Sequence, residues 1–190
     1  VLPLYGVVSE DWRRKMKEEA MFYVKLSWRE QYCGVYSLQH NGVTYYFIDN
    51  EYYFKRPDMY GNYDDCERFA FFSKAVMQMM PVIGFYPDIL HAHDWQSALS
   101  VVYLKTEYRD VPEYKNMKAI YTIHNIAYQG KYDMAILSDV FGIDYKYASI
   151  MYESARETLI PLGRKVMKEM SDGDGDYEKD FTVIQKTVCP

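Results

Sequence analysis

The sequence predicts an α/β fold with a buried parallel sheet, and a β-hairpin inserted ahead of that sheet. A strand–helix–strand pattern with short connections runs from Asp88 to Ile123, and this is typical of a βαβ unit with parallel strands. Earlier runs are rich in Val, Ile, Tyr and Phe, and His40-Asn41-Gly42 separates two of them. Asn-Gly tolerates the positive φ angles of a type I′ turn, which predicts the hairpin.

The amino-terminal part is expected to be mostly strand. Val1–Leu4 is typical of the end of a buried strand, so the sequence is expected to begin inside a domain. Three further strands are predicted from β-branched and aromatic residues, over Ala20–Trp28, Gln31–Gln39 and Gly42–Asp49. The polar and aromatic stretch Glu51–Asp65 is predicted to be a loop.

The central part alternates between helix and strand. Apolar residues at three-and-four spacing predict a helix over Cys66–Met80, and Pro81 and Gly84 are expected to end it. Asp88–His91 is predicted as a short buried strand, and a helix is expected from about residue 95 to residue 108.

A second buried strand is predicted at Ala119–Ile123, followed by a polar loop at His124–Lys131 and a short helical stretch near Met134–Phe141. In parallel sheets, ligands bind where the carboxyl ends of the strands meet their loops. The two loops that leave such ends here are polar and aromatic, with the sequences His91-Ala92-His93-Asp94-Trp95-Gln96 and His124-Asn125-Ile126-Ala127-Tyr128-Gln129-Gly130. Together they predict a site at one edge of the sheet.

Composition narrows the function classes. The 190 residues are 49% hydrophobic and 26% charged, as in globular proteins, and the formal net charge is −5. Without a basic stripe, no nucleic-acid partner is expected. No apolar run is long enough to cross a bilayer, so no membrane partner is expected. Three scattered cysteines without a CxxC pair suit a reducing compartment, and the expected location is the cytoplasm.

The histidines leave several interpretations open. His91 and His93 alternate along a strand and therefore share a face, so with His124 or Asp94 they could complete a metal shell. Histidine also suits acid/base catalysis, because it titrates near neutral pH. The structural alternative is a buried histidine pair, with Asp94 capping the next helix.

Sugar binding is a further interpretation of the same loops. Asp94, His124 and Asn125 offer donors and acceptors for hydroxyl groups, and Trp95 offers an aromatic face.

Several segments resemble bacterial glycogen synthases and plant starch synthases. The paired motifs are His91–Ala98 (HAHDWQSA) and Tyr121–Gly130 (YTIHNIAYQG), and their combination is more specific than either alone. Other segments between Val1 and about Met151 are similar to the same family: Val1–Gly6, Tyr46–Asn50, Arg56-Pro57, Tyr60 and Arg68–Phe72.

This resemblance implies a retaining glucosyltransferase of the GT-B fold, in which two Rossmann-like halves face each other across a cleft. The chain would be the amino-terminal half, which receives an α-1,4-glucan whose non-reducing end takes glucose from ADP-glucose. His124 would lie beside the transferred glucose, and Asp94 would bind the acceptor or that glucose. Asn125, Trp95 and His93 would bind substrate, and Tyr60 would stack on the acceptor. The chemistry requires no metal or cofactor.

Departures from the family pattern set further expectations. The family's Lys-x-Gly-Gly-Leu loop would lie before Val1, and the carboxyl-terminal half is not in the sequence. The isolated chain is therefore expected to be inactive, and a shortened sheet is expected to favour self-association. Residues 1–151 are predicted to form the Rossmann-like domain, and residues 152–190 a divergent tail. The alternative functions are a metal-dependent hydrolase based on the histidines and a non-catalytic glucan-binding module.

Overall fold

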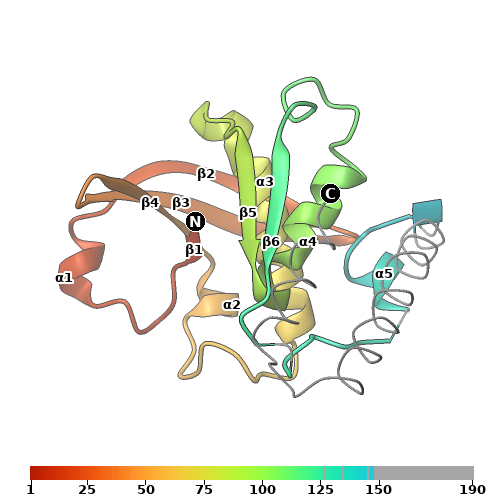
Figure 1. Ribbon diagram of the computed structural model, residues 1–190. Helices are drawn as coiled ribbons and strands as arrows, with labels where there is room; N and C mark the ends of the chain where they lie inside the picture. Colours follow the sequence, from red (N-terminus) through yellow and green to blue (C-terminus); the bar gives the residue numbers. More distant parts are fainter. Residues whose placement is uncertain (126, 134, 145, 148–190) are drawn as a thin grey trace, which may run out of the picture.

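The computed structural model describes residues 1–125, 127–133, 135–144 and 146–147, and within them it has two sheets. The first sheet has the strand order β1-β4-β3-β2 and the second pairs β5 with β6 (Figure 1). The strands are β1 (Leu2–Pro3), β2 (Lys17–Leu26), β3 (Arg29–His40), β4 (Val43–Asp49), β5 (Ile89–His93) and β6 (Lys118–Thr122). The helices are α1 (Glu10–Arg13), α2 (Glu51–Phe54), α3 (Asp65–Ile83), α4 (Asp94–Lys105) and α5 (Ile136–Asp139).

The first sheet confirms the predicted hairpin. Asn41 and Gly42 have φ angles of 49° and 78°, as a type I′ turn requires, and the strands begin to pair at His40 and Val43. β2 starts at Lys17, earlier than predicted, because Lys17 already pairs with Ser37 of the long neighbouring strand β3. The short strand β1 pairs in parallel with β4, so it belongs to this sheet.

Helix α3 lies between the two sheets and is buried on most of its surface (Figure 1). The prediction that Pro81 ends this helix is wrong, because α3 continues through Pro81 to Ile83. Proline has no N–H to donate to the Met77 carbonyl one turn earlier, and the Tyr114 hydroxyl donates to that carbonyl instead, over 2.7 Å. Gly84 ends the helix as predicted, in the left-handed conformation with a φ of 67°.

The second sheet confirms the predicted βαβ unit. β5 and β6 are parallel, with Ile89 opposite Lys118 and His93 opposite Thr122, and α4 connects them. β5 extends to His93, beyond the predicted end at His91, because pairing with β6 continues that far. α4 ends at Lys105, earlier than the predicted residue 108, and α5 covers only the middle of its predicted stretch.

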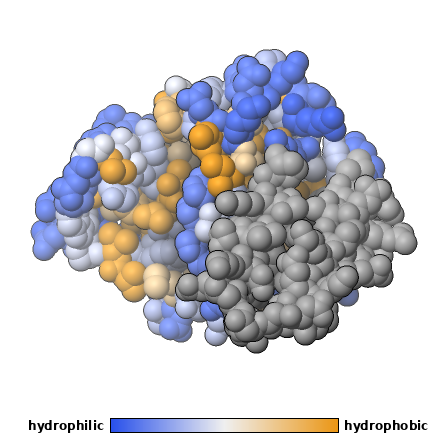
Figure 2. Space-filling view, in the orientation of Figure 1, coloured by the Kyte–Doolittle hydropathy of each residue, from blue (hydrophilic) through white to orange (hydrophobic). Residues whose placement is uncertain are grey.

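One face of β5 and β6 lacks a covering element among the described residues. Ile89 is 52% exposed and Ile120 is 41% exposed, and Figure 2 shows an apolar patch over β5 within more polar surroundings. Self-association, predicted from the shortened sheet, stays a prediction, and sedimentation as a monomer would contradict it. No helix in the described part of the chain is long and apolar enough to cross a membrane. The predicted tail, residues 152–190, lies outside the described residues.

Candidate functional site

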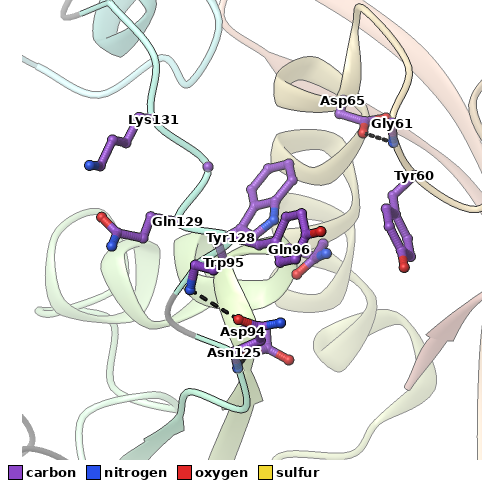
Figure 3. A pocket seen from close by; sticks show the side chains of 12 residues that line it. Tyr60, Gly61, Asp65, Asp94, Trp95, Gln96, Asn125, Tyr128, Gln129 and Lys131 are labelled. Carbon is purple, nitrogen blue, oxygen red and sulfur yellow. Dashed lines mark hydrogen bonds between the residues drawn. The ribbon is translucent and has the colours of Figure 1, made fainter.

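A cavity of about 670 Å³ lies at the carboxyl end of β5, a volume typical of ligand sites. Three segments line it: the loop before α3, the first turn of α4 and the loop that follows β6 (Figure 3). In Figure 3, Tyr60 lies across the cavity from Gln129 and Lys131, and Asp94 and Asn125 lie at one end. The sequence motifs predicted that the second and third segments would meet, and the structure brings them together.

Asp94 connects these two segments. Its carboxylate Oδ1 accepts hydrogen bonds from the backbone N–H of His124, over 2.7 Å, and of Asn125, over 3.4 Å. The alternative in which Asp94 caps α4 does not hold: Asp94 is the first helical residue, and the preceding His93 takes the cap position. Ser97 Oγ accepts from the His93 backbone N–H, over 2.6 Å.

The backbone at Asp94 is unusual. Its φ is 54°, in the left-handed region that aspartate enters more readily than most residues but still at an energetic cost. Such residues persist where surrounding contacts hold them, and they gather at functional sites. Here the bonds to the loop after β6 hold the residue, so the strained turn and the contact between the loops depend on each other.

Three histidine side chains lie close together, two from β5 and one from the loop that follows β6. His93 Nδ1 and His124 Nε2 are 3.0 Å apart, and His91 Nε2 is 2.8 Å from the hydroxyl of Thr122. His91 and His93 share one face of β5 as predicted, and both are exposed, so the structural alternative of a buried histidine pair does not hold. Among the described residues, no group of three or more His, Cys, Asp or Glu side chains is placed to hold a metal ion.

Charge and burial set the protonation of His93. Desolvation is the larger cause that lowers its pKa below the ordinary value of 6.5, and repulsion from His91 and then His124 adds to it. The Asp94 carboxylate acts in the opposite direction but does not outweigh them. The lowered pKa favours the neutral form of His93 at pH 7, in which one ring nitrogen donates and the other accepts.

Trp95 lines the cavity, but its indole also packs against protein. Its ring centroid lies 5.1 Å from that of Phe69 and 5.9 Å from that of Tyr132. The backbone of Gly130 passes so close to the indole that an added Cβ would lie 2.4 Å from Cε3. Trp95 therefore holds the loop after β6 in place, a role that the sequence did not indicate.

Replacing Gly130 with alanine is expected to lower the free energy of unfolding by about 1–3 kcal/mol through overpacking, in addition to the cost of its positive φ of 56°. Gly42→Ala is the matched control, because its φ is 78° but nothing lies within 4 Å of an added Cβ. Urea unfolding and hydrogen exchange of residues 127–131 would measure the effect. Equal losses in the two variants, with unchanged exchange in this loop, would contradict the close contact.

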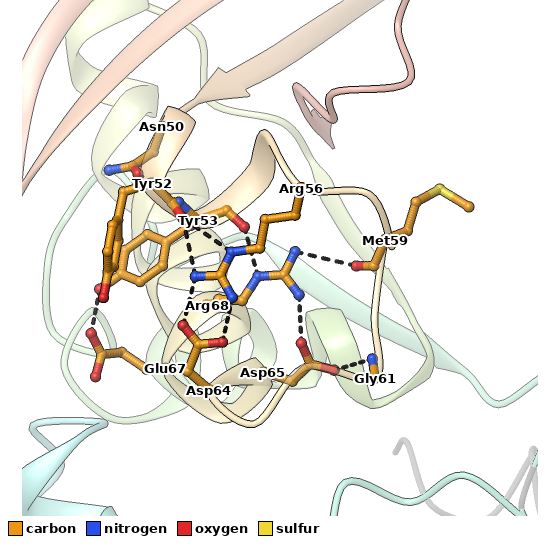
Figure 4. Close-up of polar contacts among 10 residues, drawn as sticks. All are labelled: Asn50, Tyr52, Tyr53, Arg56, Met59, Gly61, Asp64, Asp65, Glu67 and Arg68. Atoms are coloured by element: carbon orange, nitrogen blue, oxygen red, sulfur yellow. Dashed lines mark hydrogen bonds and ion pairs between the residues drawn. The ribbon is translucent and has the colours of Figure 1, made fainter.

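Tyr60 is 60% exposed and lines the opposite side of the cavity, on a loop fixed by buried ionic groups. The carboxylate of Asp65 accepts from the backbone N–H of Gly61, the next residue, over 2.5 Å. Asp65 also pairs with Arg68, which is fully buried and donates to the carbonyls of Tyr53, over 2.7 Å, and of residue 59, over 3.3 Å (Figure 4).

The ion pair between Asp65 and Arg68 was not predicted from the sequence, although two opposite charges three residues apart on a helix were a usable signal. Six other residues that line the cavity lie in the two loops predicted to form the site but were not singled out as candidates: Gln96, Ala127, Tyr128, Gln129, Gly130 and Lys131.

The structure places the six predicted site residues in two groups. Tyr60, Asp94, Trp95 and Asn125 line the cavity. The other two, His93 and His124, do not line the cavity. The His124 backbone bonds Asp94, which does line it, and the His93 ring contacts the His124 ring. Asn125 shapes its own loop, since its side-chain oxygen accepts from the backbone N–H of Ala127 over 3.0 Å.

Comparisons with known proteins find relatives over most of the chain. The family model for the starch synthase catalytic domain matches residues 1–160. The chain is 47% identical over 150 residues to the glycogen synthase of Geobacillus stearothermophilus, an alignment covering 79% of the chain and 31% of that protein. It is 51% identical over 145 residues to the glycogen synthase of Clostridium beijerinckii (strain ATCC 51743 / NCIMB 8052), covering 76% of the chain and 30% of that protein.

A solved structure is also similar, the catalytic domain of starch synthase IV from Arabidopsis thaliana bound to ADP and acarbose. It matches with a TM-score of 0.63 and 25% sequence identity, covering 77% of this chain and 30% of that one. The chain thus spans about 31% of the length of the curated relatives that it matches.

Proposed function

The chain belongs to the starch synthase catalytic-domain family, and from this premise we propose that its cavity receives an α-1,4-glucan acceptor in glucosyl transfer from ADP-glucose. The observation that carries the proposal is the single carboxylate of Asp94 that joins the loops after β5 and β6 at the cavity. The Arabidopsis neighbour is bound to ADP and acarbose, which supports a nucleotide and a saccharide as ligands of such a site.

The proposed reaction breaks the bond between C1 of glucose and the ADP oxygen, and the electron pair leaves with ADP. The 4-hydroxyl oxygen of the acceptor bonds to C1, and its proton passes to the departing phosphate. Positive charge develops on the sugar in between, and fixed dipoles and carboxylates stabilise such charge when they are already in place. Asp94 supplies a negative charge beside the cavity, and the loop that it holds carries the imidazole of His124.

Tyr60 is proposed to stack on a sugar ring of the acceptor. Its ring is exposed at the cavity, whereas the ring of Trp95 contacts other aromatic side chains. The free thiols of Cys33 and Cys66 suit a reducing compartment, which supports a cytoplasmic location for the proposed activity.

Titration with maltoheptaose tests this proposal. Tyr60→Ala is expected to weaken binding by roughly three- to tenfold, because an aromatic contact of this kind contributes about 0.5–1.5 kcal/mol. Tyr63→Ala is the matched control, since Tyr63 is 93% exposed, lies in the same loop and does not line the cavity. Absence of binding by the unmodified chain, or an equal loss in both variants, would contradict the proposal.

A further inference from the structure

Two imidazole rings meet, one from the end of β5 and one from the loop that follows β6. His93 is the last residue of β5, and His124 follows the end of β6. Their rings are nearly parallel, with an interplanar angle of 21° and centroids 5.2 Å apart, and the facing nitrogens are 3.0 Å apart. This distance is that of an N–H···N hydrogen bond, in which one nitrogen must donate and the other accept.

That bond links the tautomers of the two rings. If His93 Nδ1 carries the proton and donates, His124 Nε2 must be bare, and the proton of His124 resides on Nδ1. If instead His124 Nε2 donates, its Nδ1 is bare and can only accept. In either case the nitrogen of His124 that remains available has one defined role.

We propose that His93 is a positioning residue that fixes the ring orientation and the tautomer of His124. The proposal rests on the proposed function, because the orientation of His124 matters there for the hydroxyl group of a bound sugar. A hydroxyl can both donate and accept, so the tautomer of His124 decides which way that hydroxyl points.

Both histidines are held on either side of this bond. The His124 backbone is bonded to Asp94, and the His93 backbone N–H is bonded to Ser97. The ring centroids of His91 and His93 are 4.1 Å apart, and the ring planes are tilted by 31°. The His91 ring is held in turn by its hydrogen bond to the Thr122 hydroxyl. The His93 ring therefore lies between two other imidazoles, which restricts its rotamers.

The protonation of His93 fits this role. The titratable groups that face it are His91 on β5, Asp94 at the start of α4 and His124 after β6, and together with desolvation they lower its pKa. Because the folded pKa lies below 6.5, the unfolded chain binds this proton first as the pH falls. The stabilisation that comes from neutral His93 is therefore present above pH 6.5 and is lost as the pH falls through its folded pKa.

Nitrogen-15 NMR of the histidine rings tests the pairing directly. The chain has only four histidines, so signals can be assigned by substitution. At pH 7.5 we expect a single tautomer of His124 in the unmodified chain and a mixture in His93→Leu. His93→Asn places an amide group near the position of Nδ1. Compared with His93→Leu, it is expected to restore most of the preference of His124 for a single tautomer.

The control is His91→Phe, which keeps an aromatic ring against His93 but removes the bond to Thr122. It is expected to leave the tautomer of His124 unchanged. The same tautomer ratio in His93→Leu as in the unmodified chain would overturn the proposal. So would a change in His91→Phe as large as that in His93→Leu.

Maltoheptaose affinity provides the second measurement. His93→Leu is expected to weaken binding by roughly three- to tenfold, as the loss of one hydrogen bond does, and His93→Asn by less. Equal losses in the two variants would contradict positioning through this bond. If the unmodified chain binds no maltoheptaose, the proposed function fails, and the NMR result still decides whether His93 orients His124.

Discussion

Replacing Arg68 with alanine is expected to lower the free energy of unfolding by about 3–5 kcal/mol, the largest stability effect predicted for a single side chain here. Its guanidinium is fully buried and pairs with Asp65, whose side chain is only 6% exposed. Removing the guanidinium leaves that carboxylate buried without its counter-charge and leaves the Tyr53 carbonyl without its donor. Urea unfolding followed by circular dichroism would measure the loss.

Arg56→Ala is the matched control for Arg68→Ala. Arg56 bonds both oxygens of Asp64, over 2.6 and 2.7 Å, and its side chain is part-buried, at 17% exposure, whereas that of Arg68 is fully buried (Figure 4). We expect this variant to lose about 1.5–3 kcal/mol, less than Arg68→Ala, because the Arg56–Asp64 pair keeps some contact with water. If Arg68→Ala does not fold, Arg68→Lys is the second variant. It keeps the positive charge but not the planar set of guanidinium donors, so we expect a loss of unfolding free energy between those of Arg56→Ala and Arg68→Ala. Equal effects at Arg56 and Arg68 would show that burial does not dominate.

Replacing Asp94 with alanine is expected to weaken maltoheptaose binding by about 10- to 100-fold. Hydrogen bonds to a charged acceptor contribute about 1.5–3 kcal/mol, and about 1.4 kcal/mol corresponds to a factor of ten in affinity. The variant loses the acceptor for the backbone N–H groups of His124 and Asn125, so the loops after β5 and β6 are no longer joined. Isothermal titration calorimetry would measure the change.

Asp94→Asn separates position from charge. Asparagine keeps an oxygen that can accept from His124 and tolerates a positive φ, but it lacks the negative charge. Binding close to normal in this variant and weak binding in Asp94→Ala would show that Asp94 acts on the acceptor by holding the loops.

Asp110→Ala is the control for the loss of a negative charge anywhere on the chain, because Asp110 is exposed and does not line the cavity. Normal binding by Asp94→Ala, together with a loss in Tyr60→Ala, would favour a glucan-binding module that relies on stacking alone.

Some features of the fold followed from local sequence because their causes are local. The φ angles that Asn41 and Gly42 adopt are those that their side chains permit, so the hairpin could be predicted from two residues. Side chains alternate along any strand, so His91 and His93 had to share a face. The end of α3 at Gly84 has the same kind of cause, since glycine enters the left-handed region without steric cost.

Other features depended on partners that are distant in the sequence. α3 continues past Pro81 because a hydroxyl from Tyr114, far along the chain, takes up the carbonyl that proline leaves without a donor. The close approach of Gly130 to the indole of Trp95 likewise requires both segments to be in place. Neither arrangement has a signal within its own stretch of sequence.

By itself the sequence determined the family, the βαβ unit and two of the three segments that line the cavity, because each of these is encoded in a short run of residues. Only the tertiary structure decided that the carboxylate of Asp94 bonds the other loop rather than its own helix, and that His93 faces His124. The physical reason is that a hydrogen bond forms with whichever donor the fold brings within about 3 Å, and folding brings residues from separate strands to that distance.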